Sequence, residues 1–85
     1  MIWVINAKKT DKKYGIQIEF NDGIIGVIDF KTILSNDHRA IIRELLDENK
    51  FNAFFVENDT ISWKNGVDFA PEFLYENISK IKQVA

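Results

Sequence analysis

Residues 14–23, which read YGIQIEFNDG, determine the architecture of this chain. Apolar side chains alternate with small or polar ones over the first seven of these residues, and this period of two is typical of a strand with one buried face. The last three, Asn21-Asp22-Gly23, predict a tight turn, because Gly accepts a positive φ angle and Asn and Asp tolerate one better than most residues. Residues 24–30 then return as the partner strand. We therefore expect a β-hairpin centred on this turn.

The segment before the hairpin predicts a further strand. Residues 2–7 are rich in β-branched and aromatic types, which favour extended backbone. The polar residues 8–13 separate this segment from the hairpin and predict a turn. We expect three consecutive strands in the first part of the chain.

The period of the apolar residues changes after the hairpin. Apolar side chains recur at helical spacing in Ile41, Ile42, Leu45 and Leu46. The side chains of Ser35, Asn36 and Asp37 are all able to cap a first helical turn, so the helix is expected to begin near them. Asn49 marks its expected end, since Asn accepts the left-handed conformation that often closes a helix.

The second half of the chain predicts another hairpin and another helix. Residues 53–57 form a strand candidate, Asn58-Asp59 a two-residue turn, and residues 60–63 the returning strand. Residues 71–81 predict a short helix, because the proline at its start suits a first helical turn. The order is then β-β-β-α-β-β-α.

This order indicates the α+β class. Strands joined by two-residue turns are antiparallel, and helices that follow blocks of strands are typical of α+β proteins. We expect one domain over residues 1–85, built on an antiparallel sheet of about five strands with two helices. The longer helix is expected to cover one face of the sheet, and the C-terminal helix to pack at its side or end.

The composition excludes several classes of site. The chain has 85 residues, a net charge of −2, no Cys and one His. Disulfides and thiolate metal sites are therefore excluded, and a His-based metal site would lack ligands. No apolar run approaches the ~20 residues that span a bilayer, and the N-terminus has no signal-peptide pattern. We expect a cytoplasmic protein without cofactor or membrane association.

The sequence shows no catalytic constellation. His38 lies among helix-capping residues with no nucleophile motif near it, and no serine stands in a Gly-x-Ser-x-Gly elbow. The glycines are scattered singly, so no phosphate-binding loop is predicted. We expect a protein that is not an enzyme.

Residues 63–75, which read WKNGVDFAPEFLY, resemble the closing motif of a bacterial family catalogued as domain of unknown function 2442. The Phe-x-Asp-Gly turn of the hairpin and residues 27–30 resemble the other recurrent piece of that family. The resemblance covers nearly the whole chain. It implies a partnership with another small protein of unknown function, because genes for such a protein often stand beside those of the family, in a pattern similar to toxin–antitoxin pairs.

The motif positions are interpreted as structural. They are Asp22, Gly23, Asp29, Trp63, Asn65, Gly66, Asp68, Pro71, Glu72, Leu74 and Tyr75. We expect Asp68 and Glu72 to cap the last helix and complement its dipole, and the aromatic residues to belong to the core. Asp29 either bonds to a nearby backbone turn or protects a sheet edge. The alternative is a small-ligand or enzymatic site that uses the motif's Trp, Asp, Glu and Tyr side chains together.

Two short strands are apolar on both faces, which predicts an interaction surface. Trp3 lies in the first, and Phe54 and Phe55 lie in the fourth. Two helices cannot cover a whole sheet, so aromatic surface left over is available to a partner. The leading hypothesis is a non-catalytic protein–protein interaction module, antitoxin-like, that binds a small protein from a neighbouring gene or a second copy of itself.

A second alternative rests on the lysines of the first turn. These are Lys8, Lys9, Lys12 and Lys13, followed by Tyr14. Such a cluster is able to touch phosphate, although four charges on a net-acidic domain give weak, salt-sensitive binding. Nucleic acid is therefore not the expected partner.

Overall fold

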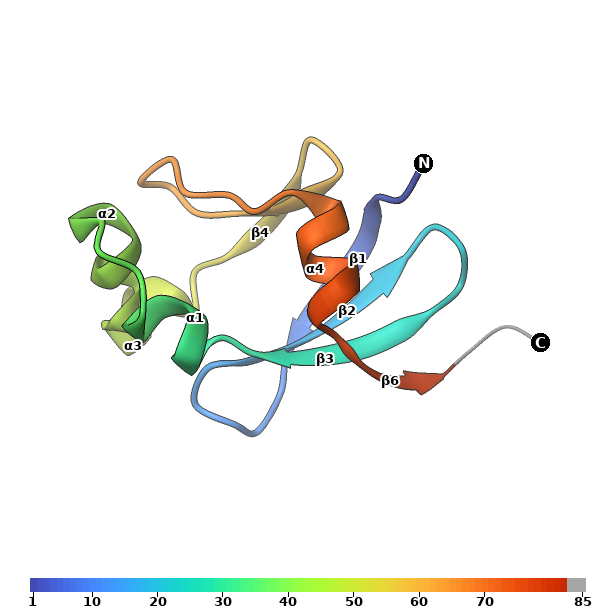
Figure 1. Ribbon diagram of the computed structural model, residues 1–85, viewed down its shortest axis with the longest axis horizontal. Helices are drawn as coiled ribbons and strands as arrows, with labels where there is room; N and C mark the ends of the chain where they lie inside the picture. The colour runs from blue at the N-terminus through green and yellow to red at the C-terminus, as the bar shows by residue number, and fades with distance from the viewer. Residues whose placement is uncertain (83–85) are drawn as a thin grey trace.

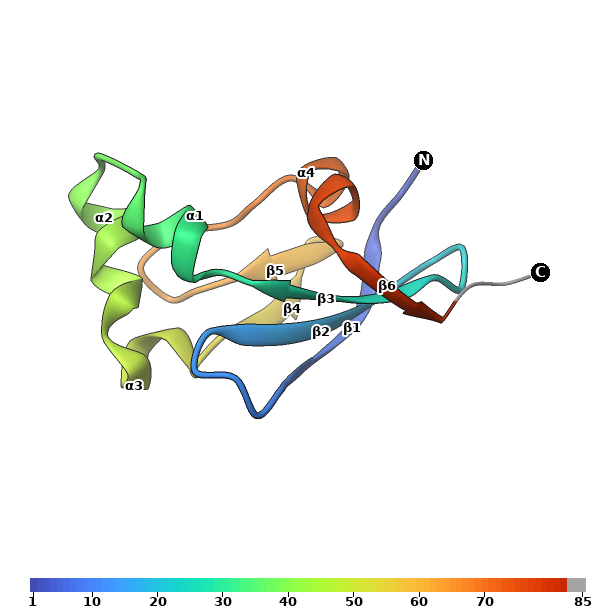
Figure 2. The same cartoon turned by 60° about the horizontal axis from the view of Figure 1, so that its bottom comes forward.

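The computed structural model describes residues 1–82 and has six strands and several short helices (Figures 1 and 2). A four-stranded antiparallel sheet has the order β1-β2-β3-β6, and a separate two-stranded sheet is formed by β4 and β5. The strands are β1 (Val4–Lys9), β2 (Gly15–Phe20), β3 (Ile25–Asp29), β4 (Phe55–Glu57), β5 (Thr60–Ser62) and β6 (Ser79–Lys82). The α+β class with an antiparallel sheet is confirmed, and residues 83–85 of the expected domain lie outside the described range.

The β2–β3 hairpin forms at the expected turn. Gly23 adopts a φ of 87°, and the Ile24 amide donates to Oδ1 of Asp22 at 3.0 Å. The register pairs Ile16 with Ile28 across the two strands, and both side chains are buried. The alternation of apolar residues thus places one complete face of the hairpin in the core.

The first strand covers residues 4–9 and so begins two residues later than expected. Hydrogen bonds to two turns fix the backbone where it begins. The Trp3 amide donates to Oδ1 of Asn21 at 2.9 Å, and the Val4 amide donates to the Asp59 carbonyl at 2.9 Å. A register shift between Val4 and Asn6 leaves Ile5 as the extra residue of a β-bulge.

The single helix expected from residues 35–37 to Asn49 is wrong. The segment instead contains four short helical pieces, namely α1 (Lys31–Ser35), α2 (Ala40–Arg43), the 3-10 turn η1 (Glu44–Leu46) and α3 (Glu48–Phe51). Asp47 has extended backbone at ψ 116°, and its carboxylate accepts from the amides of Asn49 and Lys50. Asp47 therefore begins a new helix inside the expected one, and Asn49 lies within α3 instead of ending a helix.

The C-terminal helix is shorter than expected. Helix α4 (Pro71–Asn77) ends before Ile78, whose backbone is extended at ψ 148°, and the following residues form β6 on the edge of β3. A Cβ built at Gly26 of β3 would lie 2.6 Å from the Ile78 Cβ. A glycine in β3 therefore allows the chain to return this closely to the sheet.

The core lies between the four-stranded sheet and the layer formed by the β4–β5 hairpin and α4 (Figures 1 and 2). Helices α1–α3 lie at one end of the sheet, so the expectation that the longer helix covers one face is wrong. Within residues 1–82, no helix or strand lies over the other face of the sheet (Figures 1 and 2). The largest fully buried side chains are Phe20, Phe30 and Phe51.

We predict that Gly26→Ala destabilises the protein by about 1–3 kcal/mol, the usual cost of overpacking a tight contact. The Ile78 Cβ is the atom nearest to the added methyl group, so the same change should be cheaper in an Ile78→Gly background, which lacks that atom. Urea unfolding of the four combinations measures this coupling. Gly66→Ala is the matched control, because its Cβ would meet nothing within 4 Å and only its φ of 94° is strained. Its cost should be equal in both backgrounds, and additive costs for Gly26 and Ile78 would contradict the assignment.

Candidate functional site

Trp63 stands at the end of β5 and joins three parts of the core. Its side chain is 3% exposed, and its Nε1 donates to the Phe51 carbonyl at 2.9 Å. Its ring centroid lies 5.8 Å from that of Phe51, 6.1 Å from Phe30 and 5.9 Å from Phe69. The indole is therefore fixed by one hydrogen bond and by aromatic contacts.

Asn65 and Gly66 form the turn after Trp63 and tie it to the helical end of the molecule. Oδ1 of Asn65 accepts from the Val67 amide at 3.1 Å, while Nδ2 donates to the Ile41 carbonyl at 3.1 Å. Gly66 has a φ of 94°, a conformation that favours glycine. Every polar atom of the Asn65 amide group thus has a partner within the protein.

The expectation that Asp68 caps the last helix is wrong. The N-cap of α4 is Ala70, and no side chain caps it. Asp68 is exposed and instead makes an isolated antiparallel bridge with Ser62 through the backbone. Glu72 is exposed in the first turn of α4, where a carboxylate complements the helix dipole.

Leu74 is completely buried, and Pro71 occupies the start of α4. Asp29 at the end of β3 accepts from the Lys31 amide through Oδ1 at 3.0 Å. Asp29 thus satisfies the first free amide of α1, which corresponds to the backbone-turn alternative considered for it.

A contact between Tyr75 and Asp22 connects the two segments of the family-like motif. The Tyr75 hydroxyl donates to Oδ2 of Asp22 at 2.7 Å, and the Tyr75 ring lies edge-on against Phe20 at 5.0 Å between centroids. The Tyr75 hydroxyl, followed by the Ile24 amide, lowers the pKa of Asp22 below 3.8. The same hydrogen bond raises the pKa of Tyr75 above 10.0. The contact connects α4 to the turn between β2 and β3.

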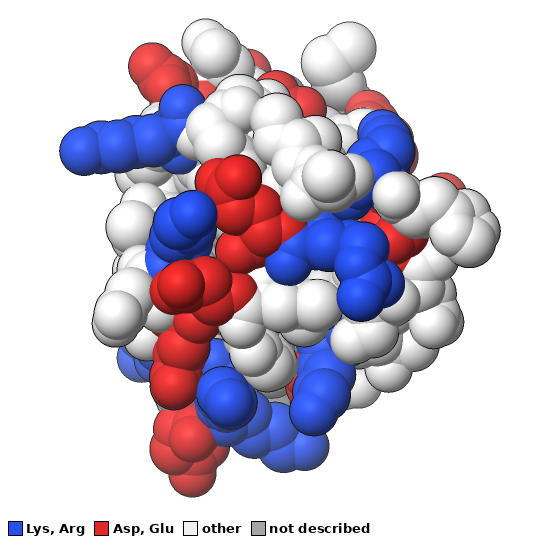
Figure 3. Space-filling view, turned by 90° about the vertical axis from the view of Figure 1, so that its left-hand side faces the viewer, with Lys and Arg blue, Asp and Glu red and all other residues white. Residues whose placement is uncertain are grey.

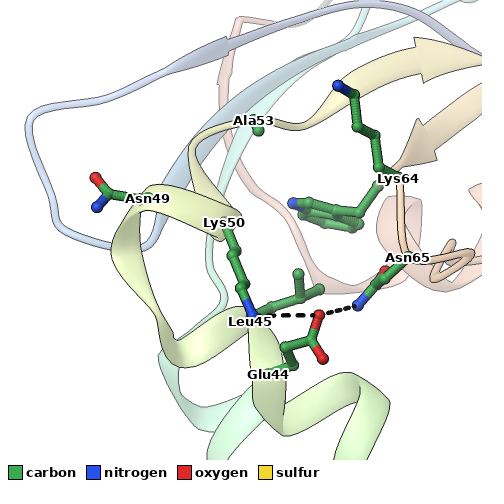
Figure 4. A pocket seen from close by; sticks show the side chains of 8 residues that line it. Glu44, Leu45, Asn49, Lys50, Ala53, Lys64 and Asn65 are labelled. Atoms are coloured by element: carbon green, nitrogen blue, oxygen red, sulfur yellow. Dashed lines mark hydrogen bonds and ion pairs between the residues drawn. The ribbon is translucent and has the colours of Figure 1, made fainter.

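A pocket of about 470 Å³ lies beside Trp63, between η1, α3 and the turn after β5 (Figure 4). Its apolar lining includes Leu45 and Ala53. Glu44 lies at its edge, where Oε1 is 3.6 Å from Nζ of Lys50 and 3.4 Å from Nδ2 of Asn65. Lys64 extends from the opposite side (Figure 4).

The pocket does not unite the residues of the ligand or enzyme alternative. Of the four, only Trp63 lines it, while Asp68, Glu72 and Tyr75 do not. Glu44, Lys50 and Lys64 were not singled out from the sequence, because they come from separate elements and share no spacing pattern. Glu44 and Lys50 approach Trp63 only in the tertiary structure, whereas Lys64 directly follows Trp63 in the sequence.

Some of the lysines around the β1–β2 turn make contacts within this part of the chain. Lys9 donates through Nζ to the carbonyls of Thr10 and Lys12, and Lys13 lies 5.6 Å from the centroid of the Tyr14 ring. On the face formed by α1–α3, positive and negative side chains are intermingled (Figure 3). That face therefore presents no uniform basic surface for a phosphate backbone.

The three residues expected at an interaction surface differ in exposure. Trp3 is 38% exposed, whereas Phe54 and Phe55 are half-buried. Phe54 packs against the core, with its ring 6.4 Å from that of Phe51. Ile5 and Val56, in β1 and β4, are more exposed than either phenylalanine.

Residues 1–82 contain neither a metal-binding cluster nor a membrane-spanning helix. No group of three or more His, Asp or Glu side chains there is arranged to hold a metal ion. In the same residues, the helices are too short and too polar to cross a membrane. His38 is exposed in the segment between α1 and α2.

We predict that Tyr75→Phe lowers stability in a pH-dependent way. Asp22 has a lowered pKa, so its contribution is complete above its unfolded value of 3.8 and is lost as the pH falls through the folded value. Tyr75 has a raised pKa, so its contribution is complete below pH 10.0 and is lost as the pH rises through the folded value. The difference in urea midpoint between the wild type and Tyr75→Phe should therefore shrink at both extremes.

Asp37→Asn is the control for this experiment. The Arg39 guanidinium lowers the pKa of Asp37 to about 2, so the difference in urea midpoint between the wild type and this variant should shrink at acid pH and stay constant at alkaline pH. A difference between the wild type and Tyr75→Phe that is constant from acid to alkaline pH would contradict the role given to the Tyr75 hydroxyl.

The comparisons with known proteins give one match. No curated protein and no solved structure matches the chain. The family described as protein of unknown function (DUF2442) matches residues 7–80. The match includes both motif segments and the contact that joins them. The chain belongs to this family of proteins of unknown function, DUF2442.

Proposed function

We propose that this protein is a non-catalytic, cytoplasmic interaction module that binds a small protein partner through an apolar patch on β1 and β4. We define the patch by Trp3, which directly precedes β1, and by Ile5 in β1 and Val56 in β4; their side chains are 38%, 50% and 39% exposed. The two strands lie close together, because the Val4 amide bonds to the carbonyl of Asp59 in the β4–β5 turn. Exposed large apolar side chains on neighbouring elements are the observation that carries the proposal.

The backbone beneath the patch is held in place, which favours binding. The Trp3 amide donates to Oδ1 of Asn21, and the Trp3 carbonyl accepts from the Asn21 amide at 3.0 Å. Ile5 is the extra residue of the bulge in β1 and points away from the core. When a partner covers these side chains, the backbone of this protein therefore loses little additional entropy.

The motif residues support a role other than catalysis. The polar atoms of Trp63 and Asn65, and one carboxylate oxygen of Asp22, bond to the protein's own backbone. Polar groups used in this way hold the fold together and are not available for a catalytic step. A protein partner is then expected at side chains outside these hydrogen bonds.

The partner that fits this proposal is a small protein with a complementary apolar surface. The family resemblance adds the expectation that its gene lies beside the gene of this protein, as in toxin–antitoxin pairs. The module would then act in an antitoxin-like manner, by covering the functional surface of that partner. Trp3 is the expected anchor, because buried Trp side chains dominate many interfaces.

We predict that Trp3→Ala weakens the complex by about 30-fold or more, the effect of losing a hot-spot residue. The protein is co-expressed with the product of the neighbouring gene, and the purified pair is studied by titration calorimetry. Ile41→Ala is the matched control, because Ile41 is 44% exposed but lies in α2, at the other end of the molecule (Figure 1). Its complex should keep the affinity of the wild type.

Two outcomes would contradict this proposal. The first is the absence of any complex between the two purified proteins at micromolar concentration. The second is an equal loss of affinity in Trp3→Ala and Ile41→Ala, which would place the interface elsewhere. If the chain instead forms a dimer that Trp3→Ala dissociates, the patch joins two copies and the proposal of a separate partner is wrong. Near-ultraviolet circular dichroism of each variant verifies that the fold is intact.

A further inference from the structure

The pocket beside Trp63 has a rigid apolar interior. The Trp63 indole is held by its hydrogen bond to the Phe51 carbonyl, and Leu45 and Ala53 add apolar lining. The volume of about 470 Å³ falls within the range of small-molecule sites. One aromatic ring or two fused rings fit a space of this size.

The charges around the pocket favour an anion. Lys50 and Lys64 both line it, and the Glu44 carboxylate is the single acidic group among the lining residues. That carboxylate already faces Nζ of Lys50 at 3.6 Å and Nδ2 of Asn65 at 3.4 Å (Figure 4). Within residues 1–82, Lys64 forms no ion pair. The pocket therefore offers a free cation beside an apolar interior, in a chain whose net charge is −2.

We propose that this pocket binds a small planar aromatic carboxylate. The ring lies in the apolar interior and contacts Trp63, because aromatic rings pack favourably against one another. The carboxylate faces Nζ of Lys64, which supplies the charge that the ligand needs. Asn65 is oriented for this site by its bond to the Ile41 carbonyl, and the turn that carries Lys64 is thereby held in place.

The site lies apart from the apolar patch on β1 and β4 and does not depend on the proposed interaction function. None of Trp3, Ile5 and Val56 lines the pocket. A Trp3→Ala variant should therefore bind the aromatic carboxylate with unchanged affinity. A result that contradicts one of the two proposals therefore does not contradict the other.

The test uses 2-naphthoate as the probe and two-dimensional NMR of the isotopically labelled full chain. The expected result is a saturable shift of the Trp63 Nε1–H signal and of the Ala53 and Asn65 amides. A Trp3→Phe variant assigns the indole signal to Trp63. The neutral isostere 2-naphthamide should bind about 5-fold or more weakly, because it lacks the charge that Lys64 recognises.

Two variants and one control variant test whether Lys64 and Ala53 contribute to the ligand site. Lys64→Gln should weaken 2-naphthoate by about 5-fold and leave 2-naphthamide unchanged. Ala53→Leu fills the pocket from an exposed position and should abolish the shifts without unfolding the protein. Lys12→Gln removes a lysine that does not line the pocket and should have no effect.

Several results would overturn the proposal. Equal affinity for 2-naphthoate and 2-naphthamide would show that charge plays no part. Tighter binding of decanoate would indicate a site for a flexible lipid chain, and equally strong shifts with inorganic phosphate alone would indicate a simple anion site. Shifts that persist in Ala53→Leu would place the ligand outside the pocket.

Discussion

The buried indole of Trp63 is the contact on which the arrangement of this small protein depends. It is in contact with Phe30 where β3 ends, with Phe51 where α3 ends, and with Phe69 before α4. A domain of 85 residues buries a modest share of its surface, so one large aromatic side chain at such a junction supplies a substantial part of the cohesion. Its single polar atom is satisfied by the Phe51 carbonyl, and no buried side-chain polar atom lacks a partner within residues 1–82.

Residues of the motif described above make several of the contacts that hold the segments around this junction together. Asn65 connects the turn after β5 to α2, and Tyr75 connects α4 to Asp22 at the tip of the β2–β3 hairpin. These contacts join segments that are far apart in the sequence, which explains why a short motif accompanies the whole fold. Two surfaces lie outside these contacts, and for each of them we propose a binding role. One is the apolar patch on β1 and β4, and the other is the charged opening of the pocket beside Trp63.

Local signals in the sequence were sufficient for the parts of the fold that local interactions determine. The alternation up to Phe20 and the turn at Gly23 predicted the first hairpin correctly, and Asn58-Asp59 predicted a turn in which both residues have positive φ. The helix after β3 was predicted as continuous, because its apolar spacing does not reveal that the Asp47 side chain captures the next two free amides. Strand β6 was missed for a different reason, since its extended form comes from pairing with β3. Of the residues that line the pocket, Trp63 and Asn65 are among the predicted motif positions, whereas Glu44 and Lys50 lie in another segment and share no sequence pattern with them.

The late position of β6 in the chain has a consequence for biosynthesis. Its partner β3 ends at Asp29, so about fifty residues must be made between the two halves of this pairing. While the chain emerges from the ribosome, the amides and carbonyls along the outer edge of β3 have no strand to bind, and such an edge readily pairs with other chains. Aggregation during synthesis is therefore governed by how soon residues 79–82 become available. Once docked, β6 becomes the new outer strand, and Lys80 places a charge there that discourages further strands from joining.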